Sequence, residues 1–63
     1  MMPDQVLARV SWLAGDRRLG EATRRALRTE VDRMVDAQRV SRAAYRVAAS
    51  RAAVAAREMG VSL

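Results

Sequence analysis

The side chains that most often perform catalysis or bind metals are scarce in this sequence. It contains no cysteine and no histidine, which removes the commonest nucleophile, the commonest general base and the usual zinc ligands. The serines have no base partner at helical spacing: Ser11, Ser41, Ser50 and Ser62. We therefore expect a protein that is not an enzyme and that has no cofactor and no metal site.

Two short motifs come closest to a ligand site. Asp32 and Asp36 lie one helical turn apart and could in principle hold a cation, but arginines flank them on both sides. A solvated, ion-paired helix face is the simpler interpretation. The stretch GDRRLG has a glycine at each end but lacks the strand and the lysine of a phosphate-binding loop. Neither motif predicts a site.

The arginines offer a surface for binding. All twelve basic residues are arginine, and the net charge is +5. Most of the excess lies after residue 36, where a helical projection places four arginines on one face: Arg39, Arg42, Arg46 and Arg57. Such a face could follow a phosphate backbone. The simpler interpretation is a solvated cationic face that keeps a small alanine-rich protein soluble, and contact with an acidic protein is a third alternative.

Trp12 is the most informative single residue. Relative to the apolar stripe of its own segment it points roughly the other way, and tryptophan is enriched among the residues that dominate interface energies. We take Trp12 as the candidate anchor for a partner. The alternative is that it packs under GDRRLG or against the next helix of the same chain.

Length and composition limit the architecture. With 63 residues the chain forms one domain, residues 1–63, whose core alone is marginal. It has thirteen alanines, one proline and no alternating β-branched pattern, which predicts an all-α fold. Its apolar runs are too short to cross a bilayer. The N-terminus also lacks the pattern of a secretory signal, because Arg9 interrupts its apolar stretch. We therefore expect a soluble, intracellular, cytoplasmic protein. The use of arginine alone is typical of a GC-rich genome, and the overall composition suggests a phage or mobile-element origin.

Helix signals divide the chain into three segments. Pro3 suits a first helical turn and Gly15 a helix end, which predicts a helix over residues 3–14 with its apolar stripe on Val6, Leu7, Val10, Leu13 and Ala14. A second helix is expected over residues 20–37, after the hinge GDRRLG. Its expected buried stripe is Thr23, Leu27, Val31, Met34 and Gln38. A third is expected over residues 41–59.

The joint between the last two segments has two interpretations. One heptad register runs from residue 27 to residue 59 without glycine or proline, which is typical of a single long coiled-coil helix. Against this, Ser41 can cap a new helix, with Val40 and Tyr45 placed to form a hydrophobic staple around it. We favour the break, and thus a short N-terminal helix followed by two longer ones.

The same register predicts a seam for self-association. Alanines along it would let two helix backbones approach closely. The seam comprises Leu27, Val31, Met34, Tyr45, Ala48, Ala52, Ala55 and Met59. Val40, Val47 and Val54 form a second stripe, which indicates that the last helix is contacted from two sides. We expect a homo-oligomer.

The final nine residues, AAREMGVSL, resemble the first helix and turn of a DNA-binding helix-turn-helix. That motif needs a further helix to enter the major groove, and we expect none after Leu63. Gly60 and Val61 instead predict a helix stop, with Gly60 in the left-handed conformation and Val61 folded back onto the preceding turn.

Together these features favour a small regulatory adaptor that is oligomeric and acts on an unidentified protein partner. The alternative is a DNA-associated accessory factor that binds the phosphate backbone through the arginine face of the last helix. Binding to a membrane surface is disfavoured, because alanine gives an apolar face little insertion energy.

Overall fold

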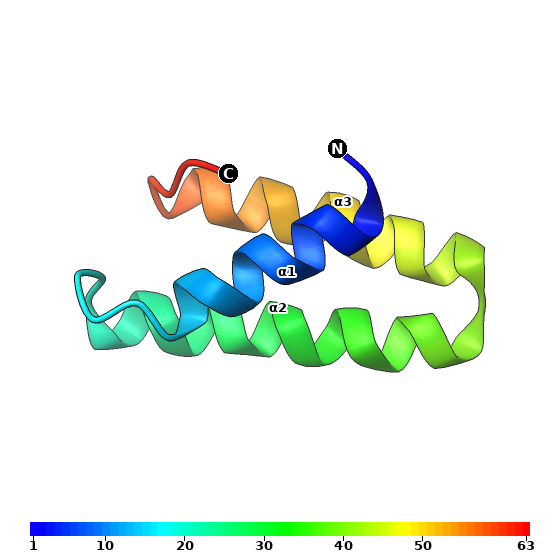
Figure 1. Ribbon diagram of the computed structural model, residues 1–63, viewed down its shortest axis with the longest axis horizontal. Helices are drawn as coiled ribbons and strands as arrows, with labels where there is room; N and C mark the ends of the chain where they lie inside the picture. Colours follow the sequence, from blue (N-terminus) through cyan, green and yellow to red (C-terminus); the bar gives the residue numbers. More distant parts are fainter.

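Three helices make up the computed structural model, which describes all residues from Met1 to Leu63 (Figure 1). Helix α1 spans Pro3–Ala14, α2 spans Glu21–Val40 and α3 spans Arg42–Glu58. The all-α unit of one short and two longer helices is confirmed, although α2 continues three residues beyond its expected end. None of these helices has an apolar stretch long enough to traverse a bilayer.

Helix α1 begins as its sequence predicts and ends differently. Pro3 occupies the first turn, and the Gln5 side chain accepts a hydrogen bond from the Met2 backbone N–H at 2.8 Å. Gly15 does occupy the C-cap, but its φ is −105°, so it does not use the left-handed conformation available to glycine. The loop that follows is closed by Asp16, whose carbonyl accepts from Leu19 N at 3.1 Å.

A single extended residue, Ser41, separates α2 from α3. Its φ and ψ are −170° and 164°, and its Oγ accepts a hydrogen bond from Ala44 N at 3.0 Å. This cap excludes the continuous coiled-coil helix. The hydrophobic staple does not form, because Val40 is 77% exposed while Tyr45 is buried among the helices. The hydroxyl cap therefore marks the break without apolar support from Val40.

Helix α2 packs against both other helices and contributes the two largest fully buried side chains, Leu27 and Met34. The expected stripe of α1 is confirmed: its members are buried except Leu7, which is half-buried. On α2, however, Gln38 is exposed and Glu30 is buried, with its carboxylate paired to Arg33 at 2.9 Å. The ion pair explains how a carboxylate is tolerated at the edge of the core.

Helix α3 packs its alanines inward, but in a register shifted from the expected one. Its buried residues are Tyr45, Ala49, Ala52 and Ala56, whereas Ala48 and Ala55 are half-buried. A heptad register is typical of a helix that packs against a single partner helix. Here α3 contacts both α2 and α1, which turns its buried face toward Ala49 and Ala56.

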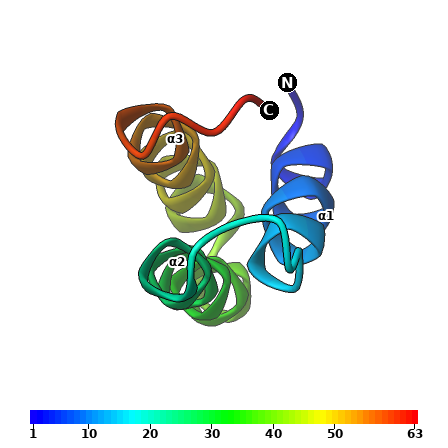
Figure 2. The same ribbon diagram turned by 90° about the vertical axis from the view of Figure 1, so that its left-hand side faces the viewer.

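The C-terminal turn ends α3 as expected. Gly60 has φ +78°, and the hydrogen bonds Val61 N to Ala56 O and Gly60 N to Arg57 O, both 2.9 Å, complete a Schellman motif. Val61 is buried in the core. The chain then runs back toward α1, so that the two termini lie close together above the space between α1 and α3 (Figure 2).

Candidate binding groove between α1 and α3

The largest concave surface lies between α1 and α3. Both helices pack mainly against α2 and contact each other less, so they diverge on the side where the two termini lie (Figure 2). Two adjoining hollows of about 270 and 780 Å³ occupy this side and share Met2, Pro3 and Arg46. We call them together the α1–α3 groove.

The larger hollow has an apolar floor. Its lining side chains come from both ends of the chain, from α1 and from one side of α3: Met1, Met2, Pro3, Val6, Arg46, Ala49, Ser50, Ala53, Val54, Arg57, Ser62 and Leu63. Small alanines on α3 leave this space open. Met1 and Met2 are exposed at the rim, where flexible thioether side chains can adapt to different contact surfaces.

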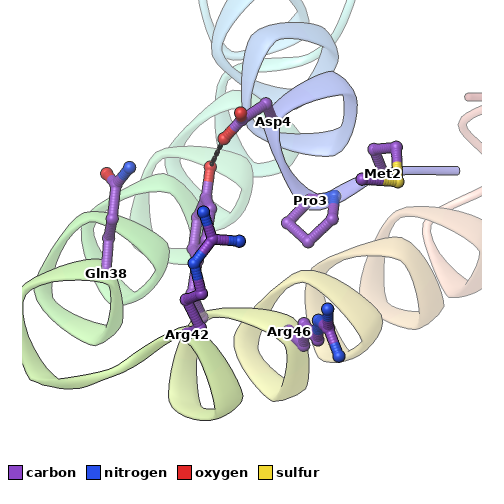
Figure 3. A pocket seen from close by; sticks show the side chains of 7 residues that line it. Met2, Pro3, Asp4, Gln38, Arg42 and Arg46 are labelled. Carbon is purple, nitrogen blue, oxygen red and sulfur yellow. Dashed lines mark hydrogen bonds between the residues drawn. The ribbon is translucent and has the colours of Figure 1, made fainter.

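The smaller hollow is polar and is closed by a hydrogen bond between α1 and α3 (Figure 3). The Tyr45 hydroxyl donates to Asp4 Oδ1 at 2.6 Å. This bond, together with burial of the phenol, raises the pKa of Tyr45 above its ordinary value. Arg42 and Gln38 line the same hollow. The bond fixes the first turn of α1 to α3 and so sets the width of the groove at this end.

Arginines dominate the charge of the groove. Arg42, Arg46 and Arg57 line it, all three are exposed, and none forms an ion pair within the chain. The only acidic residue in the lining is Asp4. An apolar floor with unpaired guanidinium groups along it suits a ligand that is both apolar and anionic.

The structure places only part of the predicted arginine face in the groove. Three of its members line the groove, whereas Arg39 lies in the last turn of α2, exposed and outside the groove. The projection treated residues 39–57 as one helix. The extended Ser41 interrupts that projection, which is why Arg39 is separated from the others.

The predicted self-association seam lies largely inside the chain. Leu27, Met34, Tyr45 and Ala52 are buried in its own core, so these four side chains cannot meet a second copy in this fold. The remaining members are half-buried: Val31, Ala48, Ala55 and Met59. Self-association stays a prediction. The apolar surface available for it is the valine stripe, where Val47 and Val54 are 58% and 44% exposed.

Trp12 points away from the core, as its spacing predicts, and is 55% exposed. It is not free of its own chain, because the guanidinium groups of Arg9 and Arg18 lie over the indole at 5.4 and 5.6 Å from the ring centroid. Arg18 belongs to the GDRRLG loop. The packing alternative is therefore met in part, by one loop side chain stacked on the ring.

Charged side chains at helical spacing line the exposed surface of α2. The pairs Glu21–Arg25 and Glu30–Arg33 form, at 3.1 and 2.9 Å. A third pair of helical spacing, Arg28 with Asp32, does not form; Arg28 Nη2 instead donates to the Ala14 carbonyl at 3.4 Å, which ties α2 to the end of α1. No cluster of three or more acidic side chains is placed to hold a metal ion.

Sequence reasoning missed the groove itself. It depends on residues far apart in the chain, such as Met2, Ala53 and Leu63, and on the angle between α1 and α3. The one sequence signal that could have indicated the groove was the Schellman motif at the end of α3, because it turns the last residues back toward the N-terminus. No protein-family model matches the chain, and the comparisons with curated proteins and with solved structures give no match either.

Proposed function

We propose that this protein is a non-enzymatic adaptor that binds an acidic, amphipathic helical segment of another protein in the α1–α3 groove. The observation that carries the proposal is the set of three unpaired arginines in the groove. Arg46 and Arg57 border the apolar floor of the larger hollow, and Arg42 lines the adjoining polar hollow. A helix whose apolar face enters a groove is a recurring mode of peptide recognition.

The spacing of the arginines defines the ligand. Arg42 and Arg46 are one turn apart, and Arg57 follows eleven residues later. From Arg42 to Arg57 the helix rises about 22 Å at roughly 1.5 Å per residue. A partner helix of about four turns spans this distance. It would carry two acidic residues four positions apart, a third about eleven positions further, and aliphatic residues facing Ala53 and Val54.

A labelled peptide of that design tests the proposal by fluorescence anisotropy. We expect the double variant Arg46→Glu/Arg57→Glu to bind at least tenfold more weakly, because each substitution replaces an attraction with a repulsion across the groove. The matched control is the double variant Arg39→Glu/Arg51→Glu, which makes the same charge change at two exposed positions outside the groove. It should bind nearly as the wild type does.

The control also defines failure. Equal losses in the Arg39→Glu/Arg51→Glu control and in the Arg46→Glu/Arg57→Glu variant would mean that only net charge matters. Equal affinity for a peptide with lysine in place of each acidic residue would exclude recognition by the arginines. Either result would refute the groove as the binding site.

The second candidate function is backbone binding to DNA, and the same unpaired arginines support it. The two functions differ in their need for the apolar floor. Val54→Ser removes apolar surface at a partly exposed position, and serine and valine have similar helix propensities. We expect this variant to bind the peptide more weakly than the wild type does and to bind a DNA duplex with unchanged affinity. DNA binding should also fall steeply with salt concentration.

A further inference from the structure

The exposed indole of Trp12 has no role in the core or in the groove. It lies in the last turn of α1, on the face opposite the buried residues of that helix, and it lines none of the hollows of the groove. Tryptophan buries a large contact area at little entropic cost when a partner covers it. A surface position is therefore unusual unless the ring has a use there.

Two cations accompany the ring. Arg9 comes from the preceding turn of α1 and Arg18 from the loop, and both guanidinium groups lie over the indole at 5.4 and 5.6 Å from its centroid. Cation–π attraction keeps such groups beside an aromatic ring without consuming their hydrogen-bond donors. Arg9 makes no ion pair within the chain.

Arg18 is held in place before any ligand arrives. Asp16 accepts hydrogen bonds from Arg18 Nε at 3.1 Å, from Nη2 at 2.8 Å and from the Arg18 backbone N–H at 3.0 Å. These bonds leave the Nη1 donors of Arg18 unused, since a guanidinium has five N–H groups. A side chain that is already ordered loses less entropy on binding.

We propose that Arg9, Trp12 and Arg18 form a second docking site, for an acidic protein segment. Carboxylates of the segment pair with the free donors of both arginines, and an aliphatic side chain covers the exposed edge of the indole. A nucleic-acid base would have to stack on the indole, whose ring already lies beside the two guanidinium groups. A second copy of the chain carries the same positive charge, +5. The site does not depend on the groove, and with it the protein would hold two acidic segments at once.

The single tryptophan allows a direct test on the whole protein. The probe is the capped hexapeptide Glu-Glu-Leu-Glu-Glu-Leu, followed through the emission of Trp12. We expect a shift to shorter wavelength on titration, and at least tenfold weaker binding in Arg9→Glu. The matched control Arg17→Glu changes the same charge in the loop at a residue that does not lie over the ring, and should bind as the wild type does.

Further variants separate this site from the groove. The double variant Arg46→Glu/Arg57→Glu should keep the full emission shift, so failure of the groove would leave this result intact. Trp12→Ala, read with a fluorescein-labelled peptide, should lose at least tenfold in affinity while its helical circular dichroism stays unchanged. Equal binding by wild type and Arg9→Glu, equal losses in Arg9→Glu and Arg17→Glu, or the same shift with a dT oligonucleotide would overturn the proposal.

Discussion

The hydrogen bond from Tyr45 to Asp4 connects α1 to α3 at the polar end of the groove, and its contribution to stability can be measured. We expect Tyr45→Phe to lower the free energy of unfolding by about 1.5 kcal/mol, at the lower end of the range for a bond to a charged group because Asp4 is exposed. Phenylalanine keeps the buried ring, so packing changes little.

The effect should be large in relative terms. A core of this size supplies roughly 3–5 kcal/mol of net stability, so this bond would account for about a third or more of it. With an unfolding entropy of roughly 2.1 cal/mol/K per residue, the loss corresponds to a Tm lower by about 11 °C. Thermal melts followed by circular dichroism at 222 nm resolve such a shift.

A double-mutant cycle with Asp4→Ala isolates the bond. Asp4 also lies in the first turn of α1, where a negative charge favours the helix dipole, and the cycle cancels that contribution. We expect a coupling free energy of about 1 kcal/mol or more, well above the roughly 0.3–0.5 kcal/mol within which independent sites add. If Tyr45→Phe costs as much in the Asp4→Ala background as in the wild type, the reasoning is refuted.

The pKa of Tyr45 gives the cycle a second readout. Its folded-state pKa lies above the ordinary value of 10.0, mainly because its hydroxyl donates to Asp4. Stabilisation from a group whose pKa is raised on folding is fully present below the unfolded-state value and is lost as pH rises through the folded-state value. The coupling free energy should therefore be constant between pH 7 and 9 and should decline above pH 10.

Two predictions concern the ends of the helices. Ser41→Ala removes the Oγ acceptor for Ala44 N and should lower the free energy of unfolding by about 1 kcal/mol, measured by urea denaturation; an unchanged midpoint would show that this hydroxyl does not stabilise the break. Gly60→Ala should cost about 1 kcal/mol, because Gly60 has φ +78°. Its matched control, Gly15→Ala, should be neutral or slightly stabilising, because Gly15 has a negative φ and a Cβ there would lie 3.7 Å from its nearest neighbour. Equal losses at both glycines in the same denaturation assay would contradict the conformational explanation.

Local signals in the sequence predicted most of the helix boundaries. Pro3, Ser41 and Gly60 each act within one turn of the chain through a fixed φ, a hydroxyl acceptor or a left-handed conformation, so their effects could be derived from sequence. Which residues of α3 face the core could not be derived in this way. Its candidate positions are nearly all alanine, and only the angle at which α1 meets α3 favours Ala49 over Ala48.

The candidate sites followed the same division. The exposure of Trp12 came from the periodicity of α1 alone, whereas its contact with Arg18 depends on how Asp16 folds the loop. Arg42, Arg46 and Arg57 were placed on one face by helical geometry. The apolar floor beside them required Met2 and Leu63, which are distant in sequence and meet only in the folded chain.

The one-residue joint at Ser41 has a consequence for the order of folding. Helices α2 and α3 are neighbours in sequence and pack along each other, and contacts between such neighbours form fastest because closing the chain costs little entropy. Helix α1 is connected to α2 through the six residues 15–20. Its contact with α3 is smaller than the contact between α2 and α3. We expect it to dock last and to detach first. The groove exists only while α1 is docked, so any ligand that occupies it would also select the fully assembled fold.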